Sequence, residues 1–191
     1  MLFRSTRERL ELAGWLSMVS AIITIPLAVF QLVTAAGQFR LISTVLSLLG
    51  VALFVYLFAL LRELLNREFD FHETDRPISL LIFGNVGLFI LGLLDDVGPK
   101  NDLWDTVTGI VAGVAAVALG ILFILFSIRL LRLGRSLFGY LKPFCYTNIG
   151  VGVCLASIIL FPLSIVASMV ADVVLGLIFF AAARQRVSRW D

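Results

Sequence analysis

One apolar segment near the C-terminus carries the residue with the greatest potential for chemistry. Asp172 stands about midway along the segment 163–183, 12 residues before Arg184. A carboxylate at the centre of a membrane helix costs about 2.5–3.5 kcal/mol on insertion scales, so such residues usually face the interior of a helix bundle. Small or polar residues recur every four positions around it, which places them on one helix face: Ser164, Ser168, Asp172 and Gly176.

Two other polar interruptions are expected at a similar depth. Asn85 lies nine residues beyond Arg76, and Thr24 lies near the middle of the first apolar segment. Together with Ser168 and Asp172 they form a candidate intramembrane polar site, which would suit an ion or a proton. The alternative is structural: Asp172 is protonated, or hydrogen bonded to a neighbouring Asn or Ser, and locks helices together. The sequence leaves both interpretations open.

A second group of carboxylates lies in a polar link. Four aspartates fall between residues 95 and 105: Asp95, Asp96, Asp102 and Asp105. Clustered carboxylates can bind Ca²⁺, but their spacing does not fit an EF-hand loop. We therefore favour a solvated cap on the neighbouring helices, with Trp104 as an interfacial anchor.

Several motifs that carry catalysis are missing from the sequence. His72 is the single histidine, and there is no HExxH, no CxxC and no glycine-rich phosphate loop after a strand. A bis-histidine haem site or a histidine-rich metal site therefore cannot form within one chain. We expect no catalytic, cofactor-binding or metal-binding residues, and we expect the protein not to be an enzyme.

The elements that must position these residues are apolar segments. Of 191 residues, 60% are hydrophobic and 15% are charged, and the mean hydropathy is +1.04; soluble domains carry about 25% charged residues. Six segments of about 17–25 residues have the length of membrane-spanning helices. The sequence thus predicts one integral membrane domain over 1–191, an all-α bundle with spans at about 12–36, 41–61, 78–94, 105–128, 144–161 and 163–183.

The basic residues indicate how such a bundle is oriented. With six spans, all of the 15 lysines and arginines except Arg40 and Lys100 fall on one side of the membrane. The positive-inside rule then places both termini in the cytoplasm. We expect the inner membrane of a prokaryote. Because topology explains the basic residues, we expect no nucleic-acid partner.

The cytoplasmic ends of the spans suggest an internal repeat. Arg76-Pro77 opens the third span and Lys142-Pro143 opens the fifth, 66 residues later. We predict three repeated antiparallel helical hairpins, with a tight turn at 161–162 inside the last. The segment 62–77 is expected to continue the second span as an amphipathic helix and to turn at Pro77.

The fourth span is rich in small residues. Gly109 and Gly113 form a GxxxG pair, and Ala116 and Gly120 belong to a second ridge. Lipid provides no hydrophobic drive for helices to associate, so close approach at small residues supplies packing. We expect this span to be central in the bundle, with one ridge as a candidate contact with another subunit.

Three classes of function remain. We favour a small non-enzymatic membrane protein, either an accessory, anchoring or scaffold subunit of a complex or a self-associating bundle. The alternative is an ion or proton channel or a small transporter that uses Asp172 and Asn85. An enzyme acting on lipid or quinone is the least favoured. The expected partners are the lipid bilayer and either a membrane protein or a second copy of the chain.

Overall fold

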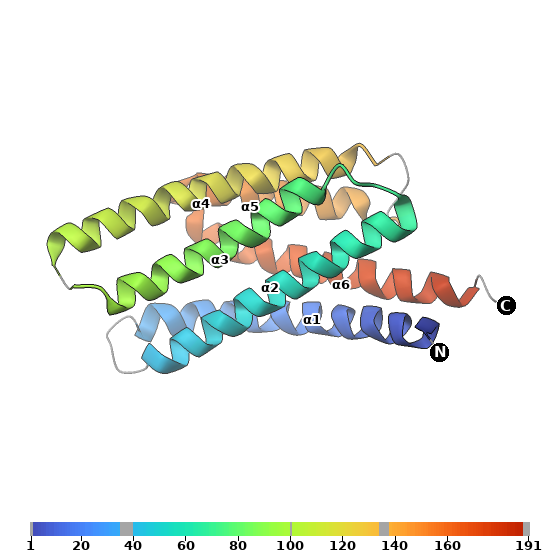
Figure 1. The fold of residues 1–191 in the computed structure, drawn as a ribbon, viewed down its shortest axis with the longest axis horizontal. Helices are drawn as coiled ribbons and strands as arrows, with labels where there is room; N and C mark the ends of the chain where they lie inside the picture. The colour runs from blue at the N-terminus through green and yellow to red at the C-terminus, as the bar shows by residue number, and fades with distance from the viewer. Residues whose placement is uncertain (1, 35–39, 100, 134–137, 189–191) are drawn as a thin grey trace.

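The computed structural model describes residues 2–34, 40–99, 101–133 and 138–188 (Figure 1). The all-α prediction is confirmed, because these residues form helices and turns and include no strand. The helices are α1 (Leu2–Thr34), α2 (Arg40–Phe69), α3 (Asp75–Val97), α4 (Asp102–Leu131), α5 (Leu141–Ala156), the short 3₁₀ helix η1 (Ile158–Leu160) and α6 (Phe161–Ser188).

Four of these helices are long and apolar enough to cross a membrane. They include the segments Leu41–Phe69, Asp75–Val97, Asp102–Leu131 and Pro162–Gln185, whose mean hydropathy is 2.2 to 2.7. By length and composition the chain is a membrane protein. Helix α5 has 16 residues and therefore rises about 24 Å, less than the roughly 30 Å hydrocarbon layer. The count of six spans stays a prediction.

The predicted C-terminal end of the fifth span, at residue 161, is wrong. The apolar segment 144–161 is not one helix: α5 ends at Ala156, η1 follows, and α6 already begins at Phe161. The turn therefore precedes the predicted position at 161–162. Pro162 explains this, because its ring would clash with the carbonyl of Ile158 if α5 continued through it. In the first turn of α6 the missing N–H of Pro162 has no such cost.

The link between α2 and α3 differs from the prediction in a similar way. Helix α2 continues past Arg62 to Phe69, as expected, but the chain turns at Asp70, which has a positive φ of 49°. Helix α3 begins at Asp75, so the prediction of a turn at Pro77 is wrong, whereas the prediction that Arg76-Pro77 opens the third span is confirmed. A proline is tolerated there because the first helical N–H groups have no partner within the helix.

The six helices alternate in direction and form a closed ring (Figure 1). Each packs chiefly against the helices before and after it, and α1 packs along α6 to close the ring. The contacts of α1 with α6 and of α4 with α5 are the most extensive, and those of α2 are the least. Helix α4 has two neighbours, as expected, but it lies in the wall of the ring and is not central. The hairpin repeat stays a prediction.

Glycines bring α4 and α5 into backbone contact. A Cβ on Gly120 would lie 2.6 Å from the carbonyl oxygen of Gly152, and a Cβ on Gly152 would lie 2.5 Å from that of Gly120. Any side chain at either position would force the helices apart. Gly109 and Gly113 have open space where a Cβ would stand, and Ala116 is half-buried. Of the two ridges, the one with Gly120 thus faces a neighbour within the chain.

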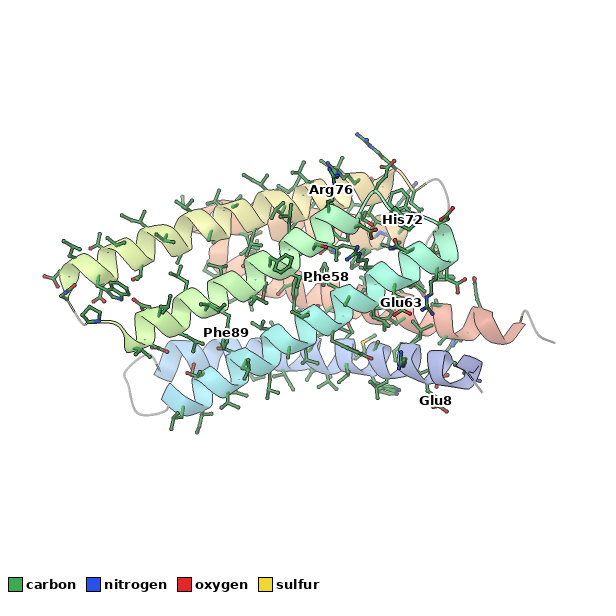
Figure 2. All side chains as sticks on the ribbon, in the orientation of Figure 1. Glu8, Phe58, Glu63, His72, Arg76 and Phe89 are labelled. Carbon is green, nitrogen blue, oxygen red and sulfur yellow. The ribbon has the colours of Figure 1, made fainter. Side chains whose placement is uncertain are left out.

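The two ends of the ring differ in charge. At one end α1 begins and α6 ends (Figure 1), and Arg76 lies there in Figure 2. We call it the basic end, defined by the basic residues near the helix ends that meet there: Arg7, Arg9, Arg62, Arg67, Arg76, Arg129, Arg132, Lys142 and Arg184. The other is the acidic end, where the last turn of α3 carries Asp95 and Asp96 and the first turn of α4 carries Asp102 and Asp105. Arg135 and Arg189, used above to orient the chain, and Lys100 lie outside the described residues.

Candidate functional site

The carboxylate of Asp172 is held by helix α1. The Oγ of Ser20 donates a hydrogen bond of 2.8 Å to its Oδ2, and the Oγ of Ser17 donates one of 2.7 Å to its main-chain oxygen. Ser17 is fully buried. One turn further, a Cβ on Gly176 would lie 3.1 Å from the carbonyl oxygen of Gly14. The face of α6 that carries Asp172 is therefore the face packed on α1.

A cavity of about 320 Å³ lies inside the ring, and all six α-helices contribute to its wall. The four residues of the predicted polar site, Asp172, Asn85, Ser168 and Thr24, all line it. They come from α6, α3, α6 and α1. The polar residues in the wall are Ser20, Thr24, Ser47, Asn85, Asn148, Ser168 and Asp172. The structure thus brings together side chains that are far apart in the sequence.

Three of these side chains are tied to their own helices. Thr24 Oγ1 donates to the carbonyl of Ser20, Ser168 Oγ to that of Ile165, and Asn148 Nδ2 to that of Phe144, at 2.8 to 2.9 Å. Such bonds satisfy a donor and fix the rotamer. The hydroxyl oxygens keep lone pairs that can accept from, or coordinate, a guest in the cavity.

Phenylalanines close the cavity on the side of the basic end. We call them the phenylalanine floor: Phe54, Phe58, Phe123, Phe126 and Phe144. Phe54 and Phe58 stack with centroids 4.3 Å apart, and Phe123 meets both edge-on at 6.2 to 6.3 Å. Figure 2 shows Phe58 roughly halfway along the bundle, between Phe89 and the basic end. Every member except Phe126 lines the cavity.

A second cavity of about 530 Å³ adjoins the first between α2 and α3. Both walls include Ser47, Val51 and Asn85. From there the second cavity runs past Phe89 to Asp96 at the acidic end. Because they share part of their walls, the two cavities together extend from Asp96 to Asp172, and we call this line the route.

Beyond the floor, polar contacts join the links of the basic end. Asp75 Oδ1 accepts hydrogen bonds from Arg62 Nε at 2.8 Å and from Asn66 Nδ2 at 3.0 Å, and its Oδ2 lies 3.3 Å from His72 Nδ1. Arg129 reaches the carbonyl of Glu73 at 3.5 Å. These contacts tie α2 to α3 and α4 to the link between them, at the end that the route does not reach.

The charges along the route are of one sign. Among the described residues that line the two cavities, the charged side chains are Asp172 and Asp96, and none is a lysine, arginine or histidine. With low-dielectric walls, such a lining attracts cations and disfavours anions. Within the described part of the chain, no three His, Cys, Asp or Glu side chains come together as a metal-binding group.

The remaining aspartates of the acidic end make local contacts. Asp95 Oδ1 accepts a hydrogen bond of 2.7 Å from Thr108 Oγ1, which joins α3 to α4. Asn101 caps α4 by accepting from the N–H of Trp104 at 2.8 Å. Asp102 and Asp105 lie in the first turn of α4, where a negative charge stabilises a helix. This arrangement agrees with the interpretation of the link as a cap.

Sequence analysis missed three parts of the site. Asn148 is almost completely buried and lines the cavity from α5; its position inside an apolar segment was a usable signal. Ser20 precedes Thr24 by one helical turn, which also marks a shared face. The phenylalanine floor had no signal, because phenylalanine in a membrane segment is equally suited to lipid. Comparisons with protein-family models, curated proteins and solved structures find no match.

Proposed function

We propose that this chain is a small cation-handling membrane protein, a transporter or channel in which Asp172 is the cation- or proton-binding carboxylate. The observation that supports the proposal is the central cavity, to which all six α-helices contribute around that one acid. A ring of helices without a central helix leaves room for a solute at the depth where an ionisable side chain is most costly. It corresponds to the channel or transporter that the sequence allows as an alternative.

The surroundings of Asp172 also favour this role over a purely structural lock. Among the described residues, the hydrogen bond from Ser20 to Oδ2 is the one side-chain bond to the carboxylate. The structural alternative also fits the bond from Ser20, which joins α1 to the carboxylate as the bond from Ser17 joins it to the main chain. The cavity beside the carboxylate is the feature that a lock does not need. A carboxylate that borders a cavity can exchange a proton or pair with a cation.

The direction of the route completes the proposal. It leads to the acidic end, and the basic end is closed by packing and by the contacts of Asp75. By the positive-inside rule we place the basic end and both termini in the cytoplasm, with six helices in the inner membrane of a prokaryote. Asp172 would then be reached from the outer side of that membrane.

Flux through reconstituted protein tests the role of Asp172. Liposomes with the purified protein are given a membrane potential, first with protons as the permeant species and a trapped pH-sensitive dye, and then with alkali cations and a trapped dye that is sensitive to the cation used. Asp172→Asn should lower the flux about tenfold or more, because contacts with a charged group contribute about 1.5–3 kcal/mol and 1.4 kcal/mol is a factor of ten. The matched control is Asp102→Asn, an exposed acid outside both cavities, which should leave the flux unchanged.

One feature of α4 supports the second candidate function, an accessory or scaffold subunit or a self-associating bundle. Gly109 and Gly113 are exposed on α4 with open space where a Cβ would stand, so another helix could approach the backbone closely there. Purification in mild detergent, with any stoichiometric membrane-protein companion identified, tests this second candidate. A liposome flux no greater than that of empty liposomes, or equal in Asp172→Asn and wild type, would reject the transporter proposal and leave this candidate.

A further inference from the structure

The wall of the central cavity does not match a bare metal cation. Hard cations such as Ca²⁺ take six to eight oxygen ligands at close range. The cavity offers one carboxylate, and its hydroxyl and amide groups come from five different helices around a space of about 320 Å³. Much of the remaining wall is carbon, from side chains such as Val51, Leu57 and Leu175. Among the described residues, no three His, Cys, Asp or Glu side chains come together there to replace the water of a bare ion.

The same wall suits a cation that carries its own apolar body. Phe54, Phe58 and Phe123 line the same space as the polar groups, and their rings pack against one another. A cation over an aromatic ring is attracted by the ring quadrupole, and recognition of quaternary ammonium groups commonly uses this contact. The volume falls in the range of about 300–1,000 Å³ that is typical of small-molecule sites.

We propose that the central cavity is a binding site for a small organic ammonium ion, whose charge pairs with Asp172 and whose apolar body lies against Phe54, Phe58 and Phe123. This rests on the proposed function and names the class of solute. The ion enters from the acidic end through the second cavity, whose wall includes Asp96 and which shares Ser47, Val51 and Asn85 with the first. The carboxylate of Asp172 replaces the water that the charge loses on entry.

Calorimetric titration of the detergent-purified protein tests this inference, with choline as the probe. Its uncharged carbon analogue, 3,3-dimethyl-1-butanol, has nearly the same shape and separates charge recognition from simple filling of space. Wild-type protein should bind choline at least about tenfold more tightly than the analogue, because 1.4 kcal/mol of charge pairing is a factor of ten. Equal affinity for the two probes, or no binding of choline, would overturn the proposal.

Variants of the acid show whether Asp172 is the partner of the charge. Asp172→Asn should weaken choline binding about tenfold or more and leave the affinity for the analogue unchanged. Asp172→Glu keeps the charge and should retain most of the choline affinity. Asp102→Asn, the matched control, should bind like wild type. Gel filtration shows whether Asp172→Asn still folds. If it does not, the affinities of Asp172→Glu for choline and for the uncharged analogue are compared instead. Equal affinity of that variant for the two probes would overturn the pairing of the charge with Asp172.

The contribution of the phenylalanine floor is tested with one variant and one matched control. Phe54 is half-buried in the cavity wall, and Phe83 on α3 is 73% exposed on the outside of the ring. Phe54→Leu should weaken choline binding about three- to tenfold, and Phe83→Leu should have no effect. Equal affinity of both variants for choline would show that the phenylalanine floor does not contact the bound cation.

A lipid headgroup carries the same ammonium chemistry, so dihexanoyl phosphatidylcholine is titrated separately. Binding tighter than that of choline would assign the site to lipid and overturn the proposal of a free cation.

The outcome is distinguishable from that of the proposed function. Proton or alkali-cation flux that depends on Asp172, without preferential choline binding, would keep the transport proposal and reject the organic cation. Preferential choline binding that depends on Asp172, without flux of any tested ion or of radiolabelled choline, would keep the binding site and reject transport.

Discussion

Helix α2 is packed very differently along its two halves. From Leu57 to Leu65, toward the basic end, it buries Leu57, Phe58, Leu61, Leu64 and Leu65 in the core. From Leu41 to Gly50, toward the acidic end, each residue is half-buried or exposed, and Leu41 is 84% exposed. The same contrast holds for α3, where the buried residues are Pro77, Ile78 and Leu81 in its first two turns.

The residue types explain the contrast. The packed half of α2 supplies leucines and phenylalanines that fill the space inside the ring, and close packing makes such a region rigid. The other half supplies Ser43, Thr44, Ser47 and Gly50, which are too small to reach across it. The packed half therefore holds the fold together, and the hollow half has room for a solute. The following predictions test that division.

The largest expected effect comes from forcing packed helices apart. Gly120→Leu would place a side chain where a single Cβ already lies 2.6 Å from the carbonyl oxygen of Gly152. We expect the free energy of unfolding to fall by more than about 4 kcal/mol, because the backbone of α5 has to move. Gly113→Leu on the same helix points into open space and should cost little. Unfolding titrations in mixed detergent micelles measure both, and equal losses would contradict the assignment of the two ridges.

A smaller effect is expected from a void in the packed half. Leu61 is fully buried and Leu41 is 84% exposed, on the same helix. Leu61→Ala should lower the free energy of unfolding by about 2–4 kcal/mol, because a cavity replaces lost contacts. Leu41→Ala should change it by less than about 0.5 kcal/mol. The same titration measures the difference, and similar costs at both positions would show that the two halves of α2 are equally packed.

The smallest effect on stability is expected in the hollow half. Ser47 borders both cavities, so Ser47→Leu adds volume to existing space and should change the free energy of unfolding by less than about 1 kcal/mol. Ser17 is fully buried between α1 and α6, and Ser17→Leu should cost about 1–3 kcal/mol by overpacking.

Ser47→Leu should affect function more than stability. Ser47→Leu narrows the junction of the two cavities and should lower both flux and choline binding, although the protein remains stable. Unchanged flux in this variant would mean that the solute does not pass between α2 and α3.

Part of the candidate site could be predicted because its signals are local. Asp172, Asn85 and Thr24 stand out as polar residues within apolar segments, and the four-residue spacing around Asp172 gives one face of α6. The cavity that they line could not be predicted from the sequence. Its closing wall of phenylalanines, and the adjoining space that ends at Asp96, depend on which residues of α2 and α3 face each other.

The amino-acid sequence by itself determined the all-helical class, the presence of long apolar segments and the separation of basic from acidic ends, since each follows from composition or spacing along one segment. The tertiary structure decided which face of each helix turns inward. Lipid is as apolar as leucine, so polarity does not mark the buried face of a membrane helix as it does in water. That is why Gly109 and Gly120 look alike in the sequence, and why only the closed ring shows that Gly109 has open space beside it and Gly120 has the backbone of Gly152.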